Sequence, residues 1–181
     1  FKNNIQIFDI NSIEDLAKGN INKETFKPIK IEKILGRDTV KPREDYMWDG
    51  VKNKVICITG AGGSIGSEIA RRCFEQRPAK LILIDNCEAN LFYINDDLLE
   101  KCTVDNLSEI PISPLLANAT DQFFLEKTFI SEKVEIVFHA AAYKHVPLVE
   151  VNPIEGIKNN FFSVQAVCKA AVKAGVKKAL L

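Results

Sequence analysis

Long apolar runs are missing from this sequence, and so is an excess of charge of one sign. No apolar run approaches the roughly 18–20 residues that a helix needs to span a bilayer, and no secretory signal opens the sequence. Lysine plus arginine and aspartate plus glutamate each total 24, and there is a single tryptophan. We therefore expect this segment to contact neither a membrane nor nucleic acid, and to be cytoplasmic.

Cysteines at metal-ligand spacing are missing as well. The five cysteines form no C-x-x-C pair, and none clusters with His139 or His145. An odd number of dispersed cysteines is typical of reduced thiols in a cytosolic protein. The sequence therefore predicts no metal site.

The composition changes near residue 50. Residues 1–50 are polar and rich in lysine, and we interpret them as a partly helical lead-in arm or linker. Residues 51–181 follow a regular pattern that predicts a separate domain. Because no methionine opens the sequence and the pattern stops inside a strand, we expect a piece of a longer protein with an incomplete second domain.

Short apolar runs alternate with amphipathic segments from residue 54 onward. Continuous β-branched runs are typical of strands buried on both faces of a sheet. The predicted strands are residues 54–59, 80–85, 112–117, 134–140 and 178–181. The predicted helices are residues 64–76, 90–101, 121–131 and 153–174, with a loop through Val146-Pro147 and a cap at Gly175. This alternation predicts an α/β fold, a doubly wound parallel, Rossmann-like sheet of order 3-2-1-4-5, truncated after the start of the fifth strand.

A glycine-rich segment joins the first predicted strand to the first predicted helix. It reads T-G-x-x-G-x-x-G, with Gly60, Gly63 and Gly66 as its glycines. Glycines at a strand-to-helix turn permit unusual torsions, and they let a pyrophosphate approach the helix start. No G-x-x-x-x-G-K-[ST] pattern is present, so a P-loop nucleotidase is disfavoured. A purely structural turn remains the alternative.

Asp85 ends the second predicted strand, 19 residues after Gly66. A carboxylate at this position accepts hydrogen bonds from ribose hydroxyls and repels a 2′-phosphate. The sequence therefore favours NAD over NADP. Asp85 could also cap the following helix, and the two roles are compatible.

Residues 59–160 resemble the extended short-chain dehydrogenase/reductase family, and within it the CapD-like nucleotide-sugar 4,6-dehydratases of bacterial polysaccharide biosynthesis. The glycine loop indicates only the superfamily. The stretch F-H-A-A-A-Y-K-H-V-P-L-V-E (138–150), followed by Asn152-Pro153, is far more specific. Residues 34–38 resemble the leader of the long members, which carry an amino-terminal membrane portion. The resemblance thus implies that the full protein could be anchored at the inner membrane.

The resemblance implies a role around NAD for each matching residue. The residues at the pyrophosphate would be Gly60, Gly63, Ser64, Ile65 and Gly66. Those at the adenosine would be Asp85, Asn86, Asn118 and Ala119, with asparagine at 118 where the family often has aspartate. Those that let the dinucleotide cross the sheet edge would be Ala140, Ala141 and Ala142. Lys144 would reach a phosphate or ribose oxygen, and Asn160 would brace the loop beneath it.

Simpler interpretations stay open for several of these residues. The alanines could serve close packing, Lys144 could be solvated, and Asn160 could bond a neighbouring backbone group. At a strand end, His139 is expected to be a hydrogen-bonded core residue. Tyr143 is expected in packing or in a cavity wall, and His145 is ambiguous.

The resemblance implies an NAD-dependent 4,6-dehydratase acting on a UDP-N-acetylglucosamine-like sugar. NAD takes a hydride from position 4 of the sugar, water leaves across positions 5 and 6, and the hydride returns to position 6. The family's proton-transfer residues follow the fifth strand, so no catalytic residue is predicted here and the 181 residues are expected to be inactive. An epimerase or reductase of the same family, or a non-catalytic dinucleotide-binding regulator, remains open. Uncovered strand and helix faces predict self-association, as a homo-oligomer.

Overall fold

The computed structural model describes residues 8–10, 26–28, 50–104 and 110–181. The chain divides into two compact units, Phe1–Arg43 and Glu44–Leu181. In the first unit, β1 (Phe8–Ile10) and β2 (Phe26–Pro28) form an antiparallel pair. The helical part predicted for residues 1–50 lies outside the described residues.

The second unit is built on a parallel sheet. Its described strands are β3 (Val55–Thr59), β4 (Lys80–Asp85), β5 (Ile112–Leu116), β6 (Ile136–His139) and β7 (Lys178–Leu180). Their order is β5-β4-β3-β6-β7, and every neighbouring pair is parallel. The predicted α/β fold and the predicted strand order are therefore confirmed.

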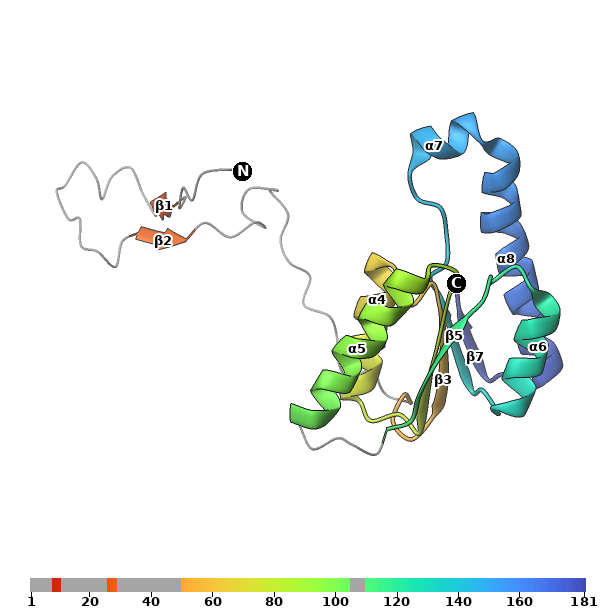
Figure 1. Ribbon diagram of the computed structural model, residues 1–181, viewed down its shortest axis with the longest axis horizontal. Helices are drawn as coiled ribbons and strands as arrows, with labels where there is room; N and C mark the ends of the chain where they lie inside the picture. Colours follow the sequence, from red (N-terminus) through yellow and green to blue (C-terminus); the bar gives the residue numbers. More distant parts are fainter. Residues whose placement is uncertain (1–7, 11–25, 29–49, 105–109) are drawn as a thin grey trace. The chain divides into compact units, whose positions relative to one another are not determined.

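Helices cover both faces of this sheet (Figure 1). On one face, α4 (Ser64–Glu75) and α5 (Glu88–Val104) pack against a core that includes Ile56 and Ile58. On the other face, α6 (Gln122–Ser131) and α8 (Pro153–Ala174) pack against a core that includes Cys57 and Val137. Successive side chains of a strand point to opposite faces, so a strand covered on both sides must be apolar at consecutive positions.

The helix ends follow from local chemistry. The Asp121 carboxylate accepts a hydrogen bond from the Phe124 N–H at 2.9 Å and caps α6. Gly175 ends α8 with φ 71°, a left-handed conformation that glycine adopts without steric cost. The predicted end of the long helix at Gly175 is confirmed.

The predicted loop through Val146 and Pro147 is wrong. These residues begin a short helix, α7 (Val146–Val151), which is followed directly by α8. Proline fits the first helical turn because its missing N–H would have no helical acceptor there.

Neither a membrane-spanning helix nor a metal-ligand cluster is found in the described segments. None of the helices there is both long enough and apolar enough to cross a membrane. No three His, Cys, Asp or Glu side chains of those segments lie close enough to hold a metal ion. The five cysteines are free thiols, and burial raises the pKa of Cys73 to about 12.

Glu135 ties the carboxyl-terminal strand to the centre of the sheet at the edge opposite the glycine loop. Its carboxylate accepts hydrogen bonds from Lys177 Nζ at 2.8 Å and from Lys54 Nζ at 3.1 Å. These bonds, that of Lys177 first, lower the pKa of Glu135 to about 2. The contribution of Glu135 to folding is therefore complete above its ordinary pKa of 4.5 and is lost as the pH falls through about 2.

We expect Glu135→Gln to lower the free energy of unfolding near neutral pH by on the order of 1 kcal/mol, the upper range for ion pairs open to solvent. The difference from wild type should shrink between pH 4.5 and pH 2, as measured by urea unfolding at a series of pH values. Glu75→Gln, at an exposed helix pair with Arg72, is the control. If the losses of unfolding free energy in Glu135→Gln and in Glu75→Gln depended on pH in the same way, the lowered pKa assigned to Glu135 would be contradicted.

Candidate functional site

The glycine loop forms a tight turn between β3 and α4. Gly60 has φ 67°, and the Gly63 N–H donates to the Gly60 carbonyl at 3.0 Å. A Cβ added at Gly66 would lie 2.0 Å from the Gly60 oxygen, so only glycine lets the first turn of α4 pack under the loop. The first N–H groups of a helix have no intrahelical acceptor and form an anion site. The loop therefore presents the start of α4 to a ligand.

Gly62 is a loop residue to which the sequence analysis gave no role. A Cβ at this position would lie 2.5 Å from the Asn90 Cβ and 2.6 Å from the Asn90 carbonyl carbon, in α5. Gly62 therefore lets the loop lie against the second helix. The two consecutive glycines at positions 62 and 63 were the sequence feature that could have indicated this close contact.

Asp85 holds the glycine loop through its carboxylate. One oxygen accepts a hydrogen bond from the Gly62 N–H at 2.9 Å, and the other accepts one from the Cys87 N–H at 2.9 Å. The side chain is buried, yet it reaches a cavity at the end of β4. Because a carboxylate has about four lone-pair sites, acceptor capacity remains on both oxygens for a ligand.

A cavity of about 170 Å³ lies at the carboxyl edge of the sheet. The predicted residues that line it come from four segments of the chain: Gly60, Gly63, Asp85, Asn86, Asn118, Ala119, Ala140, Ala141 and Ala142. It is also lined by Cys87, Asn90 and Asn159, which the sequence analysis did not select. The parallel order of β5, β4, β3 and β6 brings these strand ends together, and sequence spacing alone does not reveal such neighbours.

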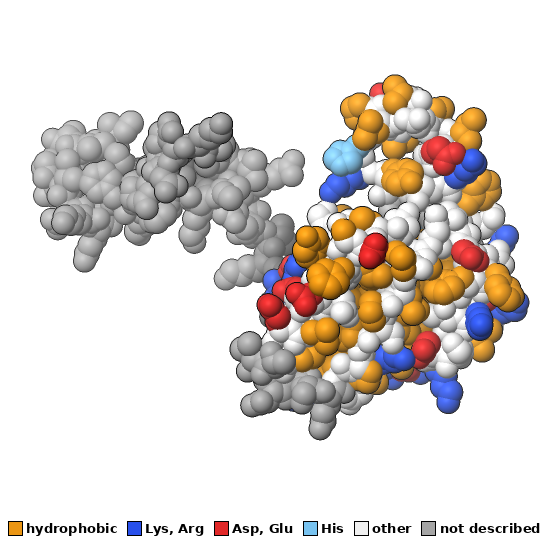
Figure 2. All heavy atoms as spheres, in the orientation of Figure 1, with side chains coloured by type: hydrophobic (Ala, Val, Ile, Leu, Met, Phe, Trp, Pro, Cys, Tyr) orange, Lys and Arg blue, Asp and Glu red, His pale blue; other side chains and the backbone are white. Residues whose placement is uncertain are grey.

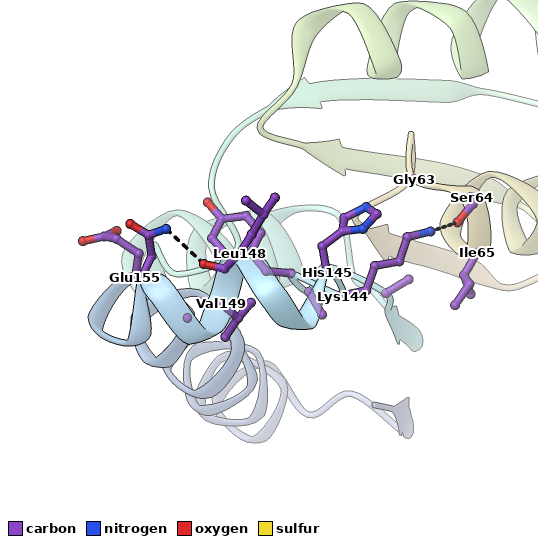
Figure 3. Close-up of a pocket in the computed structure, with 13 residues that line it drawn as sticks. Gly63, Ser64, Ile65, Lys144, His145, Leu148, Val149 and Glu155 are labelled. Atoms are coloured by element: carbon purple, nitrogen blue, oxygen red, sulfur yellow. Dashed lines mark hydrogen bonds between the residues drawn. The ribbon is translucent and has the colours of Figure 1, made fainter.

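A larger cavity of about 540 Å³ adjoins the first, because Gly63, Ala140, Ala142 and Tyr143 line both (Figure 3). The other predicted residues in its lining are Ser64, Ile65 and Lys144. Lys144 Nζ donates to Ser64 Oγ at 2.8 Å, and this bond links the segment after β6 to the first residue of α4.

Residues of α7 and of the start of α8 complete the larger cavity. They are His145, Leu148, Val149, Asn152, Glu155 and Gly156. A Cβ at Gly156 would lie 2.6 Å from Val149 Cγ1, so this glycine lets α7 pack closely on α8. None of these six residues was predicted as a site residue.

Two predicted residues lie outside both cavities. Gly66 is buried against Gly60. Asn160 lines a third cavity, of about 520 Å³, beside α8. Its amide accepts a hydrogen bond from the Tyr143 N–H at 2.7 Å and donates one to the Tyr143 carbonyl at 3.0 Å. Asn160 thus holds the backbone next to Lys144.

His139 ends β6 and makes two side-chain hydrogen bonds. Its Nδ1 lies 2.6 Å from Thr59 Oγ1, and its Nε2 lies 3.2 Å from Ser163 Oγ. Burial lowers the pKa of the imidazole. This arrangement is that of a hydrogen-bonded core histidine, as expected.

Comparison with known proteins assigns this architecture to a family. The family model described as "Polysaccharide biosynthesis protein" matches residues 56–181. The chain belongs to this polysaccharide biosynthesis protein family. The match spans the glycine loop, both cavities and the five strands of the sheet described above except the first residue of β3.

Two relatives in this family agree with the resemblance predicted from the sequence. The capsular polysaccharide biosynthesis protein CapD of Staphylococcus aureus is 35% identical over 174 residues, which are 96% of this chain and 28% of that protein. The UDP-N-acetylglucosamine 4,6-dehydratase (inverting) of Campylobacter jejuni (strain 81-176) is 32% identical over 128 residues, 70% of this chain and 35% of that protein. The predicted CapD-like relationship is confirmed, and this chain spans about a third of such relatives or less.

Solved structures share the fold of this chain. The X-ray structure of Pen from Bacillus thuringiensis superposes with a TM-score of 0.62 at 29% identity, over 71% of this chain and 38% of that one. DesIV, a dTDP-glucose 4,6-dehydratase from Streptomyces venezuelae crystallised with NAD, superposes with a TM-score of 0.54 at 22% identity, over 69% and 38%. At that lower identity, the likeness shows the fold alone.

Proposed function

We propose that this chain is the NAD-binding portion of a nucleotide-sugar 4,6-dehydratase in polysaccharide or glycan biosynthesis, with a UDP-N-acetylglucosamine-like substrate. One observation carries the proposal: the glycine loop, Asp85 and residues 140–142 line two adjoining cavities at the carboxyl edge of the sheet. In doubly wound sheets, ligands bind at this edge, where the strand order reverses. The dehydratase relative and the NAD-bound dehydratase of the same fold favour this chemistry.

The residues present fit a dinucleotide. The start of α4 has no acidic residue in its first turn, so its N–H groups and dipole can hold a pyrophosphate at Gly63, Ser64 and Ile65. A Cβ at Gly63 would point into tight space, 3.2 Å from the Gly60 oxygen. The smaller cavity offers the Asp85 carboxylate to ribose hydroxyls and the Asn118 side chain to an adenine edge.

NAD is favoured over NADP at this site. Among the described residues, Asp85 is the one acidic side chain that lines the smaller cavity, and no lysine or arginine lines it. A 2′-phosphate would face the carboxylate without a compensating cation. The geometry thus supports the NAD preference inferred from the position of Asp85 after β4.

Bound NAD would supply the hydride acceptor and donor of the redox cycle. Within this chain, the small side chains of Ala140 and Ala142 leave the edge of the sheet open to the dinucleotide. The Lys144 ammonium, now bonded to Ser64, can reach an anionic or ribose oxygen beside the loop. The apolar side chains of Ile65, Leu148 and Val149 line the larger cavity. We assign no proton-transfer step to residues 1–181.

A titration followed by an assay tests the proposal. The gene product that carries these residues, at its natural length, is titrated with NAD⁺ and with NADP⁺ by calorimetry and is then incubated with UDP-N-acetylglucosamine. We expect selective NAD⁺ binding and a 4-keto-6-deoxy product. An epimerised sugar as the product would contradict the dehydratase activity and would indicate a nucleotide-sugar epimerase. NAD⁺ binding without turnover of any UDP-sugar would favour a dinucleotide-binding regulator.

We also propose that the protein forms a homo-oligomer through α8. Ile154, Ile157 and Phe161 follow each other at i, i+3 and i+7, and each is more than half exposed. Figure 2 shows apolar side chains gathered at the end of the second unit that is formed by α7 and the start of α8. Contiguous exposed apolar surface of this kind is typical of association sites.

Light scattering tests the oligomer. We expect an assembly for wild type and a shift to monomer for Phe161→Glu, with self-association weakened by about tenfold or more. Phe123→Glu, at an exposed position of α6, is the matched control and should keep the wild-type mass. A wild-type monomer would contradict this part of the proposal.

A further inference from the structure

The histidine at the end of β6 joins the two segments that line the cavities. Thr59 is the last residue of β3 and directly precedes Gly60, while His139 is the last residue of β6 and directly precedes Ala140. The two residues are register partners in the parallel sheet, and the Ala140 N–H donates to the Thr59 carbonyl at 2.9 Å. The bond between Thr59 Oγ1 and His139 Nδ1, at 2.6 Å, adds a side-chain link between the same two strand ends.

The same imidazole reaches the helix that covers this face of the sheet. His139 Nε2 lies 3.2 Å from Ser163 Oγ in α8. These two contacts of the His139 ring, with Thr59 and with Ser163, are called the bridge below. Thr59 and Ser163 are both fully buried. A buried hydroxyl that loses its hydrogen-bond partner is destabilising, so both hydroxyls favour the present position of the imidazole.

The two segments that the contact between Thr59 and His139 links, the glycine loop and residues 140–142, are already in close contact. A Cβ at Gly60 would lie 2.6 Å from the Ala141 nitrogen and 2.8 Å from the Ala140 carbonyl carbon, so the glycine loop and the alanine segment already touch. A dinucleotide that spans both cavities must contact both segments at once. The distance between the glycine loop and residues 140–142 therefore determines how well the site is preorganised for binding.

We propose that His139 is a positioning residue for dinucleotide binding: its Nδ1 contact with Thr59 sets the separation between the glycine loop and residues 140–142. This inference rests on the proposed NAD site and adds a residue that lines neither cavity. The Nε2 contact with Ser163 anchors the ring on α8, and the Nδ1 contact transmits the ring position to the loop.

Variants that keep one contact at a time separate positioning from general stability. His139→Asn places an amide where Nδ1 stands and can keep the bond to Thr59. His139→Gln places its amide nearer to the position of Nε2 and can keep the bond to Ser163. His139→Leu keeps neither. Val137→Ala is the matched control, because Val137 is fully buried two residues earlier on the same face of β6.

The first readout is NAD⁺ affinity of the natural-length protein by calorimetry, next to thermal unfolding of each variant. We expect the Kd to rise about tenfold, as for one lost buried hydrogen bond, in His139→Leu and His139→Gln. His139→Asn should stay near wild type. Val137→Ala should lower the Tm without changing the Kd. A Kd that follows the Tm across all four variants, or that does not move in His139→Leu, would overturn the proposal.

The second readout needs no ligand. Hydrogen–deuterium exchange should become faster in residues 60–66 and 140–144 of His139→Leu and His139→Gln, but not of His139→Asn or Val137→Ala. If wild type fails to bind NAD⁺, the proposed function fails while exchange still reports on the bridge. Unchanged exchange in His139→Leu would overturn the positioning role by itself.

Discussion

Replacing Gly66 by alanine is expected to abolish dinucleotide binding and to destabilise the second unit of the chain. The new Cβ would lie 2.0 Å from the Gly60 oxygen and 2.7 Å from the Gly60 carbonyl carbon. Neither atom can yield easily, because Gly60 is itself packed against the backbone of Ala141. We expect a loss of about 3 kcal/mol or more in the free energy of unfolding, at the upper end for overpacking. Urea unfolding measures it.

Because the shift needed to relieve this overlap moves the start of α4, NAD⁺ affinity should fall by about 100-fold or more. Gly175→Ala is the control. Gly175 has φ 71° with no atom within 4 Å of its added Cβ, so alanine there should cost about 1 kcal/mol through backbone strain alone. Its NAD⁺ affinity should equal that of wild type. A Gly66→Ala protein that binds NAD⁺ like wild type would contradict the role of this glycine in close packing.

Replacing Asp85 by asparagine is expected to weaken NAD⁺ binding by about tenfold and to reduce the preference for NAD⁺ over NADP⁺ by at least as much. The charge that strengthens hydrogen bonds to ribose hydroxyls is lost, and so is the repulsion of a 2′-phosphate. An amide also offers one donor group where the carboxylate accepts two N–H groups, from Gly62 and Cys87. Calorimetric titrations with both dinucleotides measure the two effects.

Asp121→Asn is the matched control for the charge. The Asp121 carboxylate also accepts a backbone N–H, from Phe124, but it lines neither cavity. Asparagine caps a helix about as well as aspartate, so stability and both affinities should stay near wild type. If Asp85→Asn kept the wild-type ratio of the two affinities, Asp85 would be a loop anchor and not the determinant of cofactor choice.

The local sequence pattern was sufficient to predict the bounds of an element where one physical requirement dominates the segment. The run K-L-I-L-I-D predicts a strand over residues 80–85, and β4 has these bounds, because a central strand covered on both faces must be apolar throughout. The long helix over 153–174 was also predicted with its observed bounds, because proline begins it and a left-handed glycine follows it. Segments with mixed signals were less accurate: α5 begins at Glu88, two residues before its predicted start.

The fold class and the strand order could be predicted because the alternation of strands and helices restricts how a parallel sheet is connected. The glycine loop and the carboxylate at the end of β4 could be predicted because each depends on residues close together in the chain. The other features required the three-dimensional structure. It placed Gly62 against Asn90, formed α7 as a wall of the larger cavity, and put His139 between Thr59 and Ser163. These contacts join strand ends and helices that are distant in sequence, and only the parallel sheet, by aligning its carboxyl ends, brings them within hydrogen-bonding distance.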